Sequence, residues 1–189
     1  VDANSTNNSW VMGGSTNWTN PNNLFNDYNN LIFIQDKSIA QAYTLEFNEM
    51  WSGVFGANKE DNTPHLFNLN GTEVEVYFSP SDQTTSQILK FIDNVDYSLE
   101  FGLLSFTRDD IASTIIEKEG DFGVNIRGII EMQNGTGSEY DNLISGGVNV
   151  RSHMGVTYSF HHKYAIADAG STTADPTVLT GSHNWSSNA

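Results

Sequence analysis

Residues 160–168 read FHHKYAIAD, and this stretch decides the interpretation of the whole chain. It spaces three charged or titratable side chains as His161-x-Lys163-x4-Asp168, inside the alternating apolar pattern that is typical of a strand. Because side chains alternate between the two faces of a strand, His161 and Lys163 should share one face. Asp168 has the opposite parity at the strand exit, so we expect it to act through an imidazole that it orients.

A second pattern follows downstream, where residues 181–185 read GSHNW. Ser182 and Asn184 have the same parity, so they should share one face of the next strand. Nearly the same pentapeptide, GSTNW, occupies residues 14–18 near the N-terminus.

The similarity extends upstream, because Asp2 stands before the first pentapeptide as Asp168 stands before the second, with gaps that differ by one residue. A repeat nearly as long as the chain indicates two copies of one domain rather than a solenoid. In the first copy, Asp2, Ser15 and Asn17 occupy the positions of Asp168, Ser182 and Asn184.

Strands and helices alternate from residue 72 onward, which predicts an α/β domain with a mixed, largely buried sheet. The expected strands lie at about 74–79, 97–106, 123–132 and from 148, with helices at about 83–94 and 109–119 and a short one within 135–145.

Three segments follow from the same patterns. Residues 1–51 should be the C-terminal tail of a preceding domain, with a buried-type strand at 31–34 and a helix at 37–51. Residues 52–71, rich in Gly and Asn, are expected to form a linker, and residues 72–189 a near-complete second domain.

Composition narrows the function. The 189 residues carry a net charge of -15 and no cysteine, which excludes disulfides and cysteine-based zinc sites. The acidic surface disfavours a non-specific nuclease and tight binding to anionic bilayers. No apolar run is long enough for a transmembrane segment. The acidic, Asn/Ser/Thr/Gly-rich composition favours a secreted or periplasmic protein.

Six residues together resemble the HKD signature of the phospholipase D superfamily: His161, Lys163, Asp168, Gly181, Ser182 and Asn184. The resemblance covers essentially the whole chain. It implies an α/β fold with a mixed sheet flanked by helices, here as a fragment of a pseudo-twofold enzyme in which two motifs face each other. It also implies a phosphoric diester hydrolase that needs no metal and no cofactor.

The resemblance assigns roles as well. His161 is the expected nucleophile, forming a phosphohistidine that water hydrolyses, and Lys163 supplies positive charge to the phosphate oxygens. Ser182 and Asn184 are expected to donate hydrogen bonds to the phosphate. A second histidine, from a second motif, protonates the leaving group.

Several alternatives stay open. The histidine and lysine of the first motif should precede Asp2, so the expected partner is an upstream segment carrying that motif, or a second copy in a homodimer. The substrate is a phosphodiester, phospholipid or nucleic acid. Phospholipase D-like lipid hydrolysis is slightly favoured over an endonuclease, transfer to an alcohol, or a non-catalytic phosphate-binding module.

The remaining candidates have weaker contexts. His162 is expected to be structural and His183 to lie in the core or at the rim of the site, whereas His65 and His153 should be surface residues. Glu131 ends a predicted strand where α/β sheets place ligands, so it could have a supporting role. The matched Trp18 and Trp185 should pack in the core.

Overall fold

The computed structural model describes residues 2–19, 22–153 and 155–186. Two compact units emerge: Val1–Gly13 with Ile32–Ser86, and Gly14–Leu31 with Gln87–Ala189. We describe them in turn, beginning with the second unit, which contains the HKD-like residues.

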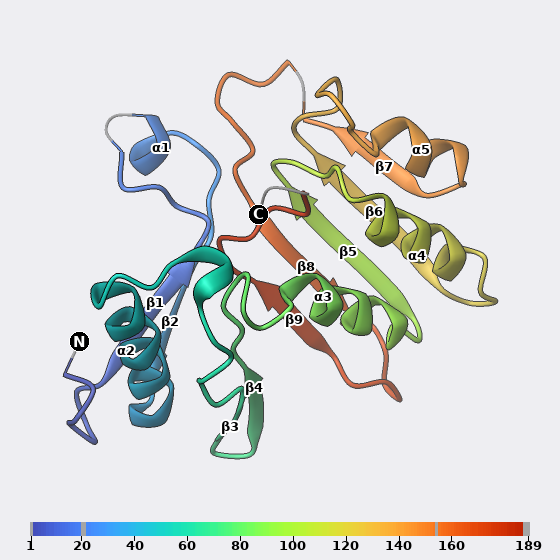
Figure 1. Ribbon diagram of the computed structural model, residues 1–189. Coiled ribbons are helices and arrows are strands. Elements are labelled where there is room, and N and C mark those ends of the chain that lie inside the picture. Colours follow the sequence, from blue (N-terminus) through green and yellow to red (C-terminus); the bar gives the residue numbers. More distant parts are fainter. Residues whose placement is uncertain (1, 20–21, 154, 187–189) are drawn as a thin grey trace. The chain divides into compact units, whose positions relative to one another are not determined.

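The second unit is built on a five-stranded mixed sheet with the order β7-β6-β5-β8-β9 (Figure 1). Parallel pairs join β5 (Ser98–Leu103) to β6 (Asn125–Ile130) and β6 to β7 (Asn149–Ser152). Antiparallel pairs join β5 to β8 (Lys163–Ala167) and β8 to β9 (Thr177–Thr180). This confirms the predicted mixed α/β fold.

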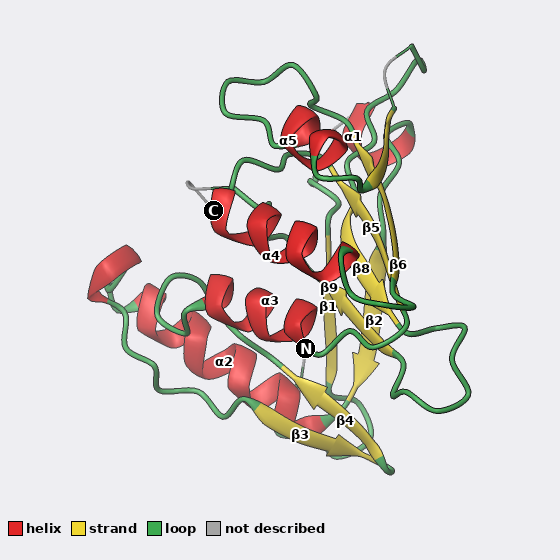
Figure 2. Ribbon diagram, turned by 90° about the vertical axis from the view of Figure 1, so that its right-hand side faces the viewer, coloured by secondary structure: helices red, strands yellow, loops and turns green. Residues whose placement is uncertain are grey.

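Helices pack on one face of this sheet, as the edge-on view in Figure 2 shows for α3 (Thr84–Asp93), α4 (Asp109–Glu119) and α5 (Tyr140–Ser145). Their apolar side chains join the strands in one buried cluster. The largest fully buried side chains of that cluster include Trp185 and Phe106, whose rings meet edge to face at 5.3 Å. The boundaries of α4 agree with the prediction, and those of α3 differ by one residue at each end.

The other face of the sheet is more open than the sequence predicted. Along β6 burial alternates strictly, with Ile126, Gly128 and Ile130 buried and Arg127 and Ile129 exposed. Alternation of this kind is typical of a sheet that is covered on one side only. The expectation of a largely buried sheet was therefore wrong for β6, although β5 is buried almost throughout.

The first unit contains α2 (Lys37–Trp51), which matches the predicted helix and begins at a cap. Asp36 has extended backbone, and its carboxylate accepts the Ile39 N–H at 2.9 Å. Such a cap satisfies one of the free donors of the first helical turn and stabilises the helix by about 1 kcal/mol.

One expectation for the first unit was wrong. The strand β2 (Leu31–Gln35), which pairs with β1 (Trp10–Gly14), is mostly exposed rather than buried. An apolar run predicts a strand but not which element covers it. The predicted linker is partly ordered, since it contains the 3-10 turn η1 (Gly56–Asn58) and β3 (Leu66–Leu69), which forms a hairpin with β4 (Thr72–Glu75). Among the described residues, no helix is long and apolar enough to cross a membrane.

Candidate active site

His161 and Lys163 meet at the end of the β5–β8 ladder, where Leu103 of β5 pairs with Lys163. The Lys163 Nζ atom lies 3.3 Å from Nδ1 and 3.5 Å from Nε2 of the His161 ring, and it donates to the His161 carbonyl at 3.2 Å. Lys163 is only 5% exposed. The predicted pairing of the two side chains is confirmed, although His161 lies two residues before the first residue of β8.

A segment from the other end of the sequence holds His161 in place. Tyr28 forms a parallel bridge with Phe160, and the Tyr28 carbonyl accepts the His161 N–H at 2.9 Å. This brings Asn29 beside the ring, with its Oδ1 atom 3.0 Å from His161 Nδ1. No pattern in the sequence predicted this contact, because the partners are 132 positions apart.

The orientation of the Asn29 amide follows from its other bonds. Its Nδ2 donates to the carbonyls of Asn23 at 2.9 Å and Asp27 at 3.2 Å, so Oδ1 is the atom that faces His161. An acceptor there favours the tautomer with hydrogen on Nδ1, which puts the lone pair on Nε2, 3.5 Å from Lys163 Nζ. Nε2 is therefore the nitrogen that can act as a nucleophile.

Ser15, from the first copy of the repeat, supports the same arrangement. It is buried, and its Oγ donates to Asn29 Oδ1 at 3.0 Å while accepting the Asn30 N–H at 3.0 Å. The Ser15 N–H in turn donates to the Asn30 carbonyl at 3.0 Å. The structure thus joins Ser15 to His161 through one intervening amide group.

Burial shapes the charges of the site. Desolvation lowers the pKa of His161, and the nearby Lys163 lowers it further. A hydrogen bond with the Ser15 backbone and the charge of Asp27 raise this pKa, but by less. The ring is therefore neutral at neutral pH. Burial also lowers the pKa of Lys163 to about 8, so the lysine keeps its charge at neutral pH and loses it in mild alkali.

Ser182 and Asn184 lie in the loop after β9 and not in a strand, because β9 ends at Thr180. Parity therefore does not place them on a common face. Ser182 is exposed, whereas the buried Oδ1 of Asn184 has no hydrogen-bond partner among the described residues. An unsatisfied buried amide is costly and is common where a ligand or water completes the bonding. Asn17 is exposed, and its backbone N–H donates to Asn23 Oδ1 at 2.6 Å.

The structure corrects the expectation for Asp168. Its Oδ1 atom accepts the N–H groups of Tyr97 at 2.7 Å and Ser98 at 2.9 Å, and both oxygens lie within 3.3 Å of the Asp96 nitrogen. Since β8 and β5 are antiparallel, Asp168 lies at the opposite end of β8 from Lys163, about 17 Å away at ~3.4 Å per residue. Asp168 fixes the start of β5 and orients no imidazole in the described chain.

Asp2 belongs to the first unit and is exposed. Its carbonyl accepts the Ser5 N–H at 2.7 Å and the Ser9 hydroxyl at 2.7 Å.

A second polar network lies one residue from His161. Glu131 Oε2 accepts the Phe160 N–H at 3.1 Å and lies 2.7 Å from His153 Nδ1. The expectation that His153 is a surface residue was wrong, because its side chain is largely buried and packs between Tyr28 and Phe160. The anticipated supporting role of Glu131 stays a prediction, now with a defined contact to the segment that carries the candidate nucleophile.

The other two histidines near the motif are half-buried. His162 packs against Phe160 and Tyr164, and its Nδ1 lies 3.3 Å from Asn30 Oδ1. His183 has a pKa that is lowered mainly by burial.

Comparison with known proteins identifies the family. Residues 88–189 match the family model described as "Cardiolipin synthase, PLD-like domain". The chain belongs to this phospholipase D family. The match includes every residue of the complete HKD motif.

Individual relatives share little sequence identity with this PLD-like chain. A mitochondrial cardiolipin hydrolase from Chlamydomonas reinhardtii is 27% identical over 114 residues, which cover 59% of this chain and 48% of that protein. The chain thus spans about half the length of this curated relative.

Two solved structures are also similar. NucT from Helicobacter pylori matches with 24% identity and a TM-score of 0.49, covering 59% of this chain and 74% of that one. Nuc, a phospholipase D family member from Salmonella typhimurium, matches with 25% identity and a TM-score of 0.44. The match covers 58% of this chain and 69% of that one.

Proposed function

We propose that this PLD-like chain supplies the nucleophilic half of a phosphodiesterase active site that needs no catalytic metal. The observation that carries the proposal is the contact between His161 and the buried Lys163, with Asn29 fixing the ring from the other side. This combination provides a neutral nucleophile beside a cation, which is what attack on an anionic phosphodiester requires.

The reaction would proceed in two displacements. The Nε2 lone pair of His161 attacks phosphorus and forms a P–N bond, while the bond from phosphorus to the leaving oxygen breaks. The Nδ1–H group keeps donating its hydrogen bond to Asn29 Oδ1, and this bond stabilises the cationic ring of the phosphohistidine. Lys163 neutralises charge on the non-bridging oxygens as the transition state forms.

A second histidine completes the cycle. It would protonate the leaving oxygen in the first step and take a proton from water in the second, when water attacks phosphorus and the P–N bond breaks. We propose that it comes from another HKD motif, either upstream in the same polypeptide or in a second copy. Residues 1–51 would then be the end of a preceding PLD-like domain, 52–71 the connection, and 72–189 the second domain.

Lipid is the favoured substrate class. The net charge of -15 opposes non-specific binding to nucleic acid and tight binding to anionic bilayers, so zwitterionic lipid fits it best. The curated relative, although it matches over only part of its length, is named as a hydrolase of cardiolipin. An endonuclease is the alternative that the test must separate.

The test uses the complete polypeptide and compares its cleavage of phospholipid vesicles (phosphatidylcholine, and cardiolipin in a second series) with cleavage of single-stranded DNA. EDTA is present, and the temperature is kept well below the unfolding midpoint. Lipid cleavage that His161→Asn abolishes supports the proposal in full. DNA cleavage with the same dependence on His161 supports the mechanism and replaces lipid by nucleic acid. Activity that survives His161→Asn would remove His161 as the nucleophile, and activity that EDTA abolishes would exclude the metal-free reaction.

A further inference from the structure

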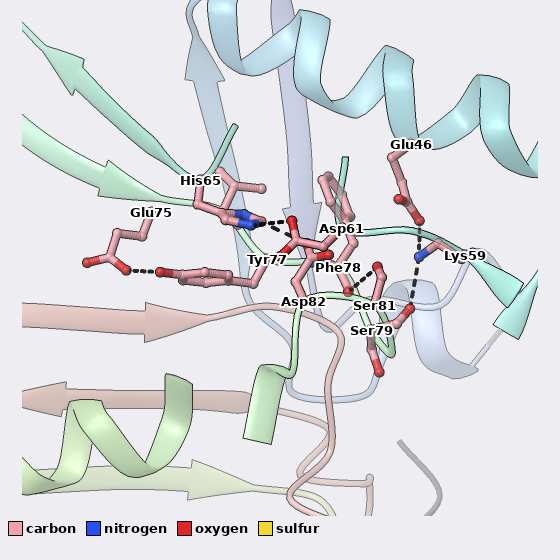
Figure 3. A network of polar contacts seen from close by, with 11 residues as sticks. Glu46, Lys59, Asp61, His65, Glu75, Tyr77, Phe78, Ser79, Ser81 and Asp82 are labelled. Atoms are coloured by element: carbon pink, nitrogen blue, oxygen red, sulfur yellow. Dashed lines mark hydrogen bonds and ion pairs between the residues drawn. The ribbon is translucent and has the colours of Figure 1, made fainter. Parts of the chain in front are cut away.

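A cluster of potential metal ligands lies in the first unit, apart from the residues of the candidate active site. Asp61 and His65 come from the segment that leads into β3, and Asp82 comes from the turn that follows β4. One nitrogen or oxygen atom of each side chain lies within 4.8 Å of the others (Figure 3). From the sequence, His65 was expected to be a surface residue without a function.

The surroundings of the His65 ring cannot be satisfied by a neutral imidazole. Nδ1 lies 2.9 Å from the Val76 carbonyl oxygen, and Nε2 lies 2.8 Å from Asp61 Oδ1. Both neighbours are acceptors, and a neutral ring carries a single N–H. If Nδ1–H donates to Val76, the lone pair of Nε2 points at a carboxylate, and a cation or a second proton must lie between them.

The buried carboxylate of Asp82 adds to this requirement. Its side chain is 1% exposed, and its Oδ2 accepts the Phe78 N–H at 2.7 Å and lies 3.8 Å from His65 Nδ1. Within the described residues, no lysine or arginine forms an ion pair with Asp82. The neighbouring Lys59 is committed to Glu46 and to the Ser79 carbonyl at 3.1 Å (Figure 3). Among the described residues, the positive charge that could offset this buried carboxylate is therefore that of His65, either as an imidazolium or through a metal ion that the ring binds.

We propose that Asp61, His65 and Asp82 bind a divalent transition-metal ion of the Zn²⁺ type, through His65 Nε2 and one oxygen of each carboxylate. Imidazole and carboxylate are both common zinc ligands, and bonds of ~2.0–2.2 Å place neighbouring ligand atoms about 3.0–3.5 Å apart. The separation of 2.8 Å between Asp61 Oδ1 and His65 Nε2 is already close to this range. The Asp82 carboxylate lies 3.8 Å from Nδ1 and would have to turn and move closer to reach an ion on Nε2. Water would fill the remaining position.

The Val76 carbonyl fits a role in support of this site. A histidine that binds a metal through one nitrogen usually donates its other N–H to a carbonyl or carboxylate, which fixes the tautomer and the ring orientation. Tyr77 adds a further restraint by stacking on the His65 ring at 4.8 Å. The ring is therefore held in place by the two residues that directly follow β4.

The ion would act as a structural cross-link, because its ligands come from two segments that are 17 positions apart at His65 and Asp82. A chain without cysteine has no disulfide to join such segments. The proposal departs from the expectation that this protein holds no metal, and it does not involve the phosphodiester chemistry.

The test titrates ZnCl₂ into the full chain, freed of metal by EDTA and then dialysed, with binding followed by calorimetry and stability by thermal unfolding. The expected result is saturable binding of one ion that raises the unfolding midpoint. His65→Gln should abolish this binding, and Asp61→Asn should weaken it at least roughly tenfold. Asp61 is largely exposed, so Asp61→Asn should fold even if changes at Asp82 do not.

His183→Gln is the matched control, since it removes another partly buried histidine outside the cluster and should leave this binding intact. Zinc binding that is unchanged in both His65→Gln and Asp61→Asn would overturn the proposal by placing the ion at other histidines. The absence of any zinc binding would also overturn it, and would leave a proton as the cation between His65 and Asp61.

Discussion

The two copies of the repeat form the same local turn and then diverge in what their side chains do. Asp2 and Asp168 both have left-handed backbone, with φ of 54° and 59°. Each carbonyl accepts an N–H three residues later, from Ser5 at 2.7 Å and from Ser171 at 3.0 Å. Short-range sequence therefore determines this turn twice, independently of its surroundings.

Beyond the turn the copies differ in surroundings. Trp185 is 1% exposed in the core of the second unit, whereas its counterpart Trp18 is 78% exposed. The Asp168 carboxylate is buried on backbone amides, and Asp2 is exposed. Similar sequence thus produces the same local backbone in both copies, whereas tertiary packing determines which copy of a residue stabilises the fold.

Substituting the two tryptophans by alanine should give the largest difference between the copies in the free energy of unfolding. Trp185→Ala removes a fully buried ring that packs against Phe101 and Phe106, and it should lower the free energy of unfolding by about 3–5 kcal/mol. Trp18→Ala should change it by less than about 0.5 kcal/mol. Urea unfolding of the two variants measures both values. Equal losses would show that Trp18 is also packed in solution.

The aspartate pair comes next. Asp168→Ala leaves backbone N–H groups at the start of β5 without their acceptor and should lower the free energy of unfolding by about 2–4 kcal/mol. Asp2→Ala, at an exposed carboxylate, should have little effect. Chemical denaturation provides the measurement, and amide exchange of Tyr97 and Ser98 locates the effect. A stable Asp168→Ala protein without activity would instead support a catalytic role for this carboxylate.

The glycines of the two pentapeptides should also differ in how much their substitution by alanine destabilises the protein. Gly14 has φ of 144°, and a Cβ there would lie 2.2 Å from the Asn30 carbonyl oxygen, so Gly14→Ala should lower the free energy of unfolding by about 1–3 kcal/mol. Gly181 has ordinary φ and open space, so Gly181→Ala should be nearly neutral. Thermal melts of the two variants under identical conditions decide the matter. A severe loss in Gly181→Ala would contradict the open surroundings of that glycine.

The smallest expected effect concerns pH and the lysine of the complete motif. Because burial lowers the pKa of Lys163 to about 8, its charge is present below that pH and is lost above it. We expect kcat/KM of the complete polypeptide to fall about tenfold per pH unit above roughly pH 8. In mild acid activity should persist below about pH 6.5, because the pKa of His161 is lowered and its ring stays neutral.

The measurement is a pH profile of kcat/KM, with circular dichroism at each pH to show that the fold is unchanged. A profile that stays level to about pH 10 would mean that Lys163 is not the group that binds the phosphate charge.

Local patterns in the sequence were enough to predict the α/β alternation, the boundaries of α2 and α4, and the pairing of His161 with Lys163. These features depend on periodicity, capping and strand parity, which act over a few residues. The repeated turn at Asp2 and Asp168 belongs to the same class.

The contacts between separate segments could not be predicted from the sequence and became visible in the tertiary structure. It placed Asn29 and Ser15 beside His161, moved Asp168 to the far end of β8, exposed Trp18 and gathered Asp61, His65 and Asp82 into one cluster. The physical reason is that hydrogen bonds and burial depend on which segments the fold brings together, and the local sequence around a residue does not specify which other segment will lie against it.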